Sequence, residues 1–397
     1  MSIKRINNLL KSIKDSYKSL EDGIYKVSEV VKPPKGPKLS LYNIYIFEFL
    51  IMFYSLLIGL LHIKVKEKYI FVNVRFGDLI HSLDKKDVLV CGGKKDFLYC
   101  LKHRIKFKWI GFLIKAFDIY YYYGRDKSYV EALNLLNKLF SDDKEKQFIF
   151  LWDDMQKLGT SFAHVFRQRD SIEVVCIQHG IYVFNDSNIS PGSNSNYNFV
   201  FKSSQIDLIK GANENNSFVM GLSYNVSAPA MFKKNIYLVG IGALGANDPD
   251  YLLSLWFYLR ICKEFSDTEY TVYYRPHPVE DLEFCNKCFT NIDTTPIKNI
   301  LNSFSSIYIG FNSTVLYEAK VFGNIVIKIE DKETFPLIND FDVDFLIDKN
   351  NIGSILSKLN EYISNEYISN EYSLPTYQDS INSRFMKCLD AIRFNDK

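Results

Sequence analysis

The chain has 397 residues, of which 47% are hydrophobic and 15% aromatic, and this is enough to build two α/β domains with cores of their own. Its formal net charge is only +2, whereas a nucleic-acid-binding protein normally carries a large basic excess, so the composition argues against that class. Seven scattered cysteines and the lack of a signal peptide predict free thiols in a reducing cytoplasm.

Basic residues are concentrated near the start of the chain, where Lys and Arg crowd the segments 64–68 and 102–108. A surface of this kind suits anionic lipid or an anionic acceptor, although solvated surface charge is the commoner reason for such a bias. We expect peripheral association with the inner face of the cytoplasmic membrane through this basic N-terminal region. Cys285 and Cys288 have metal-ligand spacing, but no second pair completes a tetrahedral set, so no metal is predicted there.

The first 63 residues contain two predicted helices and a linker. Residues 1–22 carry apolar side chains at helical spacing, and the Pro/Gly/Lys segment 32–38 then breaks the pattern. The stretch 41–63 is nearly uncharged and long enough to cross a bilayer. Four polar residues interrupt it, namely Asn43, Glu48, Ser55 and His62. We therefore favour a buried or membrane-apposed helix over a membrane span.

From residue 69 onward, short apolar runs alternate with amphipathic ones, which indicates βαβ units around a parallel sheet. One series of strands is predicted at 69–74, 88–91, 148–152, 172–177 and 199–202, and a second at 236–242, 270–274, 306–309 and 325–329. We predict an α/β fold with two Rossmann-like domains that face each other across a cleft. These comprise residues 1–225, with a helical N-terminal extension, and residues 226–375, followed by a C-terminal helix in 376–397.

Two acidic residues, Asp153 and Asp154, directly follow a predicted buried strand. Ligands of open α/β sheets bind at the carboxyl ends of the strands, so an acid here can serve as a catalytic carboxylate. Asp153 with Gln156 three residues later also fits a helix capping box. Because that explanation leaves Asp154 without a role, we favour Asp154 for chemistry and keep Asp153 open.

The next predicted strand ends at Gln178-His179-Gly180. The glycine permits a tight turn, which leaves the histidine at the edge of the sheet. A lone histidine is more often structural, but one placed a single βα unit after the paired acids also fits a functional site. Both interpretations stay open for His179.

The second domain contains Arg275-Pro276-His277-Pro278 at the end of a predicted strand. Each proline fixes its own φ and pushes its predecessor toward extended geometry, so Arg275 and His277 project from the strand end. Arg275 offers a fork of donors to a phosphate or carboxylate, and His277 can donate to phosphate or act as an acid. The structural alternative is a rigid strand exit with a surface arginine and histidine.

Two further loops of this domain could contact an anion. Ser313 and Thr314 can cap a helix whose free N–H groups would also bind a phosphate. The spacing of Gly240, Gly242 and Gly245 resembles a dinucleotide motif. No clear acid stands at the end of the next strand, so we favour a glycine-rich loop lining the ligand cleft over NAD binding.

Taken together, these clusters resemble the bacterial GT-B-type glycosyltransferases that use CMP-activated ulosonic acids. The resemblance covers residues 148–320 and rests on four short motifs in the same order. It is nearest to the retaining β-Kdo transferases of capsule and O-antigen assembly, and sialyl- and polysialyltransferases are more distant. It implies a GT-B-like fold with an acceptor-side first domain and a second domain that binds the CMP-sugar donor.

The resemblance also assigns donor-binding residues. In the sialyltransferases, a His-Pro motif and a Ser-Ser/Thr motif bind the CMP of the donor. The corresponding donor-binding candidates, with their motif neighbours, are Gln178, Gly180, Arg275, His277, Pro278, Asn312, Ser313 and Thr314.

Catalytic residues follow by the same comparison. An acidic pair supplies a carboxylate beside the anomeric carbon, which matches Asp153 and Asp154. The sialyltransferase motif normally ends in glycine, whereas Met155 follows here, which weakens that comparison. Gln178-His179-Gly180 instead favours the Kdo-transferase side. In the β-Kdo enzymes an aspartate is thought to act as nucleophile, with a histidine and an arginine near the sugar, which implies His179 and Arg275.

The sequence thus predicts a cytoplasmic, membrane-associated glycosyltransferase that moves an ulosonic acid, foremost Kdo, from a CMP donor to a surface polysaccharide or glycolipid. No cofactor, metal or nucleic acid is expected, because Arg275, His277 and the helix start at Ser313 can stabilise the leaving phosphate. An inverting CMP-sialic acid-dependent sialyltransferase with an Asp base is the enzyme alternative. A non-catalytic glycan- or nucleotide-binding assembly protein is the alternative of another class.

Overall fold

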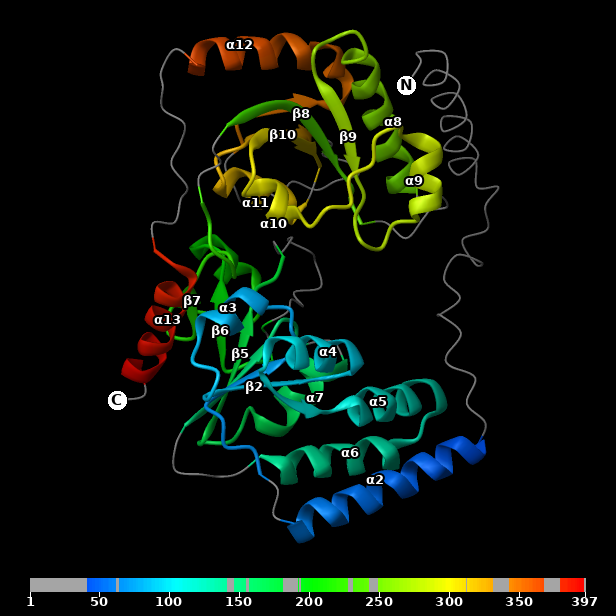
Figure 1. Ribbon diagram of the computed structural model, residues 1–397, viewed down its shortest axis with the longest axis vertical. Helices are drawn as coiled ribbons and strands as arrows, with labels where there is room; N and C mark the ends of the chain where they lie inside the picture. Colours follow the sequence, from blue (N-terminus) through cyan, green and yellow to red (C-terminus); the bar gives the residue numbers. More distant parts are fainter. Residues whose placement is uncertain are drawn as a thin grey trace. The chain divides into compact units, whose positions relative to one another are not determined.

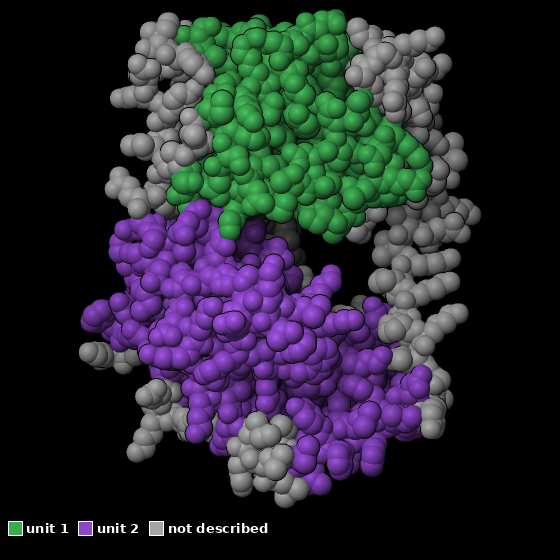
Figure 2. Space-filling model, in the orientation of Figure 1, with its two compact units in different colours: residues 1–32, 226–378 green, residues 33–225, 379–397 purple. Residues whose placement is uncertain are grey.

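The computed structural model forms two compact units (Figure 2), called unit 1 for Val226–Gln378 and unit 2 for Pro33–Asn225 with Asp379–Lys397. The predicted helix at 1–22 and the linker at 32–38 lie outside the residues that the structure describes. The described residues are 41–61, 64–140, 146–154, 157–180, 192, 194–227, 231–242, 249–311, 313–330, 343–367 and 379–395.

Unit 2 is built on a seven-stranded parallel sheet with the order β3-β2-β1-β4-β5-β6-β7. The strands β1, β2, β4 and β5 are buried along their whole length, which explains their continuous apolar sequences. The strands are β1 (Tyr69–Val72), β2 (Val88–Gly92), β3 (Lys106–Trp109), β4 (Gln147–Leu151), β5 (Ile172–Ile177), β6 (Tyr197–Val200) and β7 (Ser217–Val219).

Helices cover this sheet and enclose two apolar cores. They are α2 (Leu41–Leu61), α3 (Gly77–Ser82), α4 (Lys94–His103), α5 (Gly111–Tyr123), α6 (Asp126–Leu139), α7 (Lys157–Phe166), the short η2 (Ser203–Leu208) and α13 (Ile381–Asn395). The last helix, α13, comes from the end of the chain and packs Phe385 and Leu389 into the core beside β1, β2 and β4. Its Arg384 donates hydrogen bonds to the carbonyl groups of Met220, Leu222 and Tyr224.

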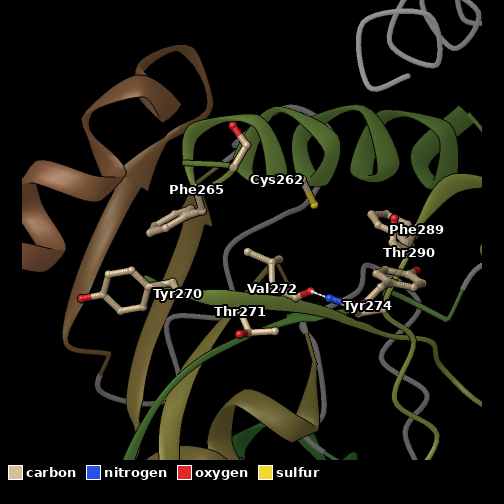
Figure 3. A pocket seen from close by; sticks show the side chains of 10 residues that line it. Cys262, Phe265, Tyr270, Thr271, Val272, Tyr274, Phe289 and Thr290 are labelled. Atoms are coloured by element: carbon tan, nitrogen blue, oxygen red, sulfur yellow. Dashed lines mark hydrogen bonds between the residues drawn. The ribbon is translucent and has the colours of Figure 1, made fainter. Parts of the chain in front are cut away.

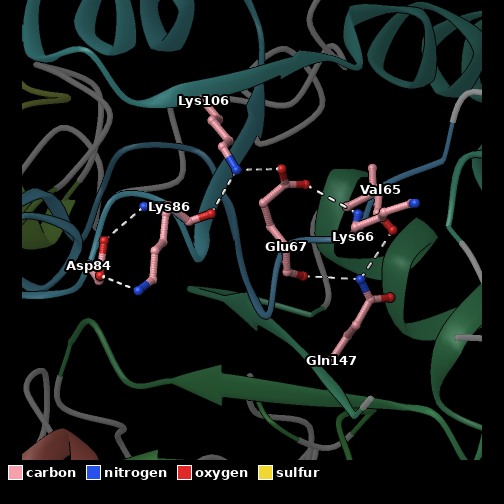
Figure 4. Close-up of polar contacts among 7 residues, drawn as sticks. All are labelled: Val65, Lys66, Glu67, Asp84, Lys86, Lys106 and Gln147. Atoms are coloured by element: carbon pink, nitrogen blue, oxygen red, sulfur yellow. Dashed lines mark hydrogen bonds and ion pairs between the residues drawn. The ribbon is translucent and has the colours of Figure 1, made fainter. Parts of the chain in front are cut away.

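Polar contacts join the amino ends of four strands in unit 2 (Figure 4). The Lys106 ammonium bonds the Glu67 carboxylate at 3.0 Å and the Lys86 carbonyl at 2.7 Å. Gln147 donates to the carbonyl groups of Glu67 and Val65 at 3.0 and 3.3 Å. This network ties together the starts of β1 to β4 and leaves the carboxyl edge of the sheet to other residues.

Unit 1 is built on a five-stranded parallel sheet with the order β12-β11-β10-β8-β9. Tyr237 of β8 stacks between Tyr273 and Tyr308 of the two neighbouring strands, with ring centroids 5.4 and 5.1 Å away. The strands are β8 (Phe232–Val239), β9 (Thr271–Arg275), β10 (Ser305–Gly310), β11 (Ile325–Glu330) and β12 (Phe345–Asp348). The helices are α8 (Pro249–Glu264), α9 (Leu282–Cys288), α10 (Ile297–Leu301), α11 (Thr314–Val321), the short η3 (Lys349–Ser354) and α12 (Ile355–Tyr367).

The predicted α/β class with two parallel-sheet domains is confirmed, as Figure 1 shows for each unit. Three strands were not predicted, namely β3, β7 and β12, and each lies at an edge of its sheet. Edge strands are short and half-exposed, so their apolar signal is weak. Among the described residues, no helix is both long and apolar enough to cross a membrane.

Candidate functional site

Each sheet has one place where the strand order changes direction. In open α/β sheets, ligands bind at such a switch point, outside the carboxyl ends of the strands. In unit 2 this switch point lies between β1 and β4, because the chain continues from β1 to β2 on one side and from β4 to β5 on the other. In unit 1 it lies between β8 and β10, by the same reasoning. Among the predicted site residues, Asp153 and Asp154 follow β4 and Ser313 follows β10, which flank these points, whereas His179 and His277 follow the adjacent strands β5 and β9. Each unit is described separately below.

Three side chains form a row at the switch point of unit 2. The Arg75 guanidinium, from the loop after β1, lies over the Trp152 ring at 4.5 Å. Trp152 directly follows β4, and its ring meets the His179 ring edge-on with centroids 4.7 Å apart. Asn73 positions the arginine loop, because it adopts φ +74° and its side-chain oxygen accepts from the Arg75 N–H at 2.9 Å. Three neighbouring strands thus place a cation, an indole and an imidazole together.

The protonation of His179 follows from its hydrogen bond. Its Nδ1 lies 2.7 Å from the Trp152 carbonyl oxygen, which can only accept, so Nδ1 carries the proton. The other nitrogen, Nε2, is then an acceptor. Burial, and next the charge of Arg75, lower the pKa of His179 to about 4, although the bond to Trp152 opposes this shift. The side chain is therefore neutral at physiological pH and presents a lone pair.

Asp154 is fully buried and holds a loop in place. Its Oδ1 accepts from the Gly192 N–H at 2.8 Å, and its Oδ2 accepts from the Asn194 N–H at 2.7 Å and the Ser195 hydroxyl at 3.0 Å. Burial raises the pKa of this carboxyl, while the three hydrogen bonds oppose the shift. A carboxylate with three protein donors and no exposed surface suits a positioning role better than bond making.

Asp153 is slightly more exposed than Asp154, with 8% of the residue exposed. It lies in the chain between Trp152 and Asp154. Its backbone is closely packed, since a Cβ at Gly159 of α7 would lie 1.7 Å from the Asp153 carbonyl oxygen. Only glycine fits there, which fixes where β4 passes into α7. The capping-box alternative depends on Gln156, which lies outside the described residues.

Gln178 is buried, and its amide is used within unit 2. Its Nε2 donates to the Gly180 carbonyl at 2.8 Å and to the side chain of Gln205, while its Oε1 accepts from the Phe201 N–H at 2.7 Å. These contacts bind the end of β5 to the end of β6. The described contacts of Gln178 therefore orient the turn that carries His179.

In unit 1, two loops pack on one buried carboxylate. Glu280 accepts from the Tyr274 hydroxyl at 2.6 Å and from the Gly242 N–H at 3.2 Å. Burial raises the pKa of Glu280, and these hydrogen bonds oppose the shift. A Cβ at Gly240 would lie 2.5 Å from a Glu280 carboxylate oxygen and 2.8 Å from the His277 backbone nitrogen. The glycines after β8 are thus required by the close approach of the turn after β9.

His277 is exposed beside this glycine loop. Its ring packs against Gly242, where a Cβ would come within 3.2 Å of the ring and where φ is +83°. The Val279 N–H points to the Nδ1 of His277 at 3.4 Å, which favours Nδ1 as acceptor and places the proton on Nε2. The Nε2 of His277 is then a donor, whereas the Nε2 of His179 is an acceptor. Pro278 is exposed in the same turn.

Arg275 is half-buried, and one arm of its guanidinium is already bound. Its Nη1 donates to the Thr295 carbonyl at 2.6 Å. Burial lowers the pKa of Arg275, opposed by Asp293 and other neighbouring groups. If Arg275 binds a phosphate with two hydrogen bonds, as predicted, these must come from the nitrogens that do not contact Thr295.

The predicted helix start after β10 is present. The Ser313 hydroxyl accepts from the Val315 N–H at 3.3 Å and caps α11, which begins at Thr314. Asn312 and Gly245 lie outside the described residues. Cys285 and Cys288 are buried in α9, where the Cys285 sulfur contacts the Tyr251 hydroxyl at 3.2 Å. Within the described part of the chain, no three His, Cys, Asp or Glu side chains gather as metal ligands.

A separate pocket of unit 1 lies beside the start of β9 and the end of α8 (Figure 3). Its lining includes Cys262, Phe265, Tyr270 and Phe289, and no charged residue lines it. The loops of Gly240 and His277 follow the carboxyl ends of β8 and β9, whereas this pocket lies toward the start of β9; Tyr274 lines it and also donates to Glu280. An uncharged lining also gives it no means to neutralise a phosphate.

The sequence analysis missed two residues at the carboxyl edges of the two sheets, Arg75 and Glu280. Arg75 directly follows the predicted strand 69–74, but no motif there singled it out, and β1 itself ends at Val72. The polar segment that follows the apolar run was the available signal. Glu280 stands just after the Pro-His-Pro turn, but only the packed structure shows that both neighbouring loops rest on it.

No family model and no curated protein matches the chain. Among solved structures, it is similar to UDP-GlcNAc 2-epimerase from Neisseria meningitidis bound to UDP-GlcNAc, with 10% identity, a TM-score of 0.51 and coverage of 82% of this chain and 99% of that one. It is also similar to the wall teichoic acid polymerase TagF soaked with CDPG, with 11% identity, a TM-score of 0.50 and coverage of 90% and 96%. At this level of identity the likeness concerns the fold, and the chain has a GT-B-like fold.

Proposed function

We propose that the chain is a glycosyltransferase that moves a sugar from a nucleotide-activated donor to a glycan or glycolipid acceptor. The observation that carries the proposal is the pair of oppositely presented imidazoles, with an acceptor nitrogen on His179 and a donor nitrogen on His277. Transfer needs both functions, since the leaving phosphate gains negative charge while the acceptor hydroxyl loses a proton. Solved proteins of the same fold that carry UDP-GlcNAc or CDPG support a nucleotide-linked donor.

In this proposal, unit 1 binds the nucleotide. The exposed Nε2–H of His277 donates to a phosphate oxygen, beside the backbone of Gly242. The capped start of α11 at Ser313 adds N–H groups and a favourable dipole end for the same anion. Glu280 holds the glycine loop and the histidine turn in register, so it acts as a positioning residue.

Unit 2 supplies the groups that react with the sugar. Asp153 attacks the anomeric carbon as the bond to the phosphate oxygen breaks, and the bonding electron pair leaves with the nucleotide. The acceptor hydroxyl then displaces the Asp153 carboxylate, and its proton passes to Nε2 of His179. This sequence gives net retention. Asp154 keeps the neighbouring loop in place and does not react.

Arg75 favours a sugar that is itself an acid. This exposed cation lies at the switch point of unit 2, one ring away from His179. A guanidinium can bind a carboxylate with two parallel hydrogen bonds. Ulosonic acids carry a carboxylate on the anomeric carbon itself, so a CMP-ulosonic acid, foremost CMP-Kdo, is the proposed donor. An inverting sialyltransferase that uses Asp153 as base fits the same cation.

The donor is tested by measuring thermal stabilisation of the full chain with CMP-Kdo, CMP-sialic acid, UDP-sugars and CDP-glycerol. We expect the largest stabilisation with CMP-Kdo, and a response to UDP-sugars alone would overturn the proposed donor. By calorimetry, His277→Ala should weaken CMP binding about 10- to 150-fold, because a hydrogen bond to a charged group contributes about 1.5–3 kcal/mol. His164→Ala, at an exposed histidine of α7, is the matched control and should change nothing.

Intact-protein mass spectrometry separates the two stereochemical outcomes. A retaining double displacement leaves a sugar adduct on the chain, and Asp153→Asn should remove it. No adduct, with transfer still active, would favour the inverting alternative. Donor binding by the folded wild-type chain without any transfer or donor turnover would instead support a non-catalytic binding protein.

A further inference from the structure

Helix α2 buries two of its polar side chains, Glu48 and Ser55, which is unusual for a helix at a protein surface, while Asn43 near its start is exposed. The residues buried against unit 2 are Ile44, Glu48, Ile51 and Ser55, which recur on one face of the helix. Two of these four side chains are polar. The helix runs beside α6, as Figure 1 shows, and Ile51 joins the core that α6 lines.

Specific polar contacts fix this rotation of the helix. The Arg125 guanidinium pairs with the Glu48 carboxylate at 3.1 Å, and the Ser128 hydroxyl donates to it at 2.9 Å. Burial opposes ionisation of Glu48, but the hydrogen bonds of Arg125 and Ser128 outweigh it and lower the pKa of this carboxyl. Further along, the Lys138 ammonium donates to the Ser55 hydroxyl at 2.9 Å. The helix is therefore held at two places, with Glu48 and Ser55 facing the protein.

The opposite face of α2 is apolar and exposed. Its large exposed hydrophobic side chains are Tyr45, Ile46, Phe49, Leu50, Met52, Phe53, Leu56 and Leu57, here called the outer face. No charged residue occurs in α2 apart from the inward-facing Glu48. These side chains follow one another closely from Tyr45 to Leu57, over about 18 Å of helix, so the outer face is a continuous apolar strip and not a scatter of single side chains.

Cations border this strip at both ends. Arg125 lies over the Tyr45 ring at 5.1 Å, and exposed Lys127 is close enough to act on the charge of Glu48. Exposed Lys138 lies near the other end at Ser55, and exposed Lys64 follows the helix in the chain. An apolar strip flanked by Lys and Arg is the arrangement that lies in a bilayer interface, with apolar groups among the acyl chains and cations at the phosphates.

We propose that α2 docks unit 2 on a phospholipid bilayer, with the helix axis in the plane of the membrane and the outer face inserted. A span is incompatible with the packing, because α6 covers the inner face over the same stretch. A second copy of the chain fits less well, since two-fold pairing of this strip would bring cations of both copies together at each end. The bordering charges thus favour lipid as the occupant, whatever the donor of the enzyme is.

The test is co-sedimentation of the full chain with vesicles of phosphatidylcholine and with vesicles of phosphatidylcholine mixed with phosphatidylglycerol. The variant Phe49→Ser/Leu56→Ser removes side chains of residues that are 67% and 60% exposed on the outer face. The matched control, Phe394→Ser/Leu346→Ser, removes the same pair of residue types at exposed sites outside α2, which are 71% and 42% exposed. Thermal denaturation of both variants verifies that each is folded.

We expect the wild-type chain to bind both kinds of vesicle, more strongly when anionic lipid is present. The outer-face variant should lose at least about tenfold in its partition coefficient, because inserted apolar area dominates the affinity. The control should bind like the wild type. Equal binding by both variants, or no binding by the wild type, would overturn the proposal. A dimer in solution that only the outer-face variant dissociates would assign the strip to a second copy instead.

Discussion

Replacing Gly240 by Ala should destabilise unit 1 by overpacking the junction of its two ligand loops. The new Cβ would lie 2.5 and 2.8 Å from the two Glu280 carboxylate oxygens and 2.8 Å from the His277 backbone nitrogen. The carboxylate cannot swing aside cheaply, because the Tyr274 hydroxyl and the Gly242 N–H hold it in place. Either the glycine loop or the histidine turn must therefore shift.

The size of the effect follows from two opposing contributions. Overpacking a tight site costs about 1–3 kcal/mol, whereas replacing glycine stabilises by about 0.4–1 kcal/mol through lower freedom of the unfolded chain. The net loss should be about 1–2 kcal/mol, which corresponds to a fall in melting temperature of about 2–8 °C for a domain of this size. Gly353→Ala is the matched control, because a Cβ there meets nothing within 4 Å. It should be neutral or slightly stabilising.

Chemical denaturation of the full chain gives the free energy of unfolding of both variants. Calorimetry with CMP shows whether the shifted loop still binds the nucleotide. In the Glu280→Ser background, the smaller side chain makes room for the Cβ, so the cost of Gly240→Ala should shrink. A double-mutant cycle gives this coupling free energy. If Gly240→Ala is as stable as Gly353→Ala and binds CMP normally, the loops do not depend on each other through Glu280.

The remaining predictions concern unit 2. Asp154→Ala should cost about 1–3 kcal/mol of stability by leaving buried donors without an acceptor, whereas Asp153→Asn should chiefly abolish transfer; equal stability losses would contradict this division. Because the folded-state pKa of His179 is about 4, below its ordinary 6.5, its stabilising contribution is complete above pH 6.5 and is lost as the pH falls toward 4. When the free energy of unfolding is measured against pH, His179→Gln should remove the part of the pH dependence that comes from this histidine. That part amounts to at most about 3 kcal/mol, and solvent screening reduces it. Arg75→Lys should weaken binding of a CMP-ulosonic acid more than binding of CMP, because Lys lacks the two-armed fork.

The central strands were readable because burial on both faces demands uninterrupted apolar residues. The predicted strand 172–177 coincides with β5, and the predicted strand 88–91 differs from β2 by one residue. The edge strands β3, β7 and β12 were missed for the complementary reason, since half-exposed strands resemble loops in composition. Strand ends were misjudged by two residues at the end of β1 and by four and three residues at the start and end of β8.

The sequence by itself determined the fold class, the alternation of strands and helices, and the short polar segments that follow the strands. Proline, glycine and charged residues at strand ends are local signals, so they can be read without the fold. The tertiary structure alone decided what each side chain does with its atoms. Asp154 and Gln178 are occupied by neighbouring loops, while the Nδ1 of His179 meets the Trp152 carbonyl and the Nδ1 of His277 meets the Val279 N–H. These roles depend on partners distant in the chain, which no local pattern encodes.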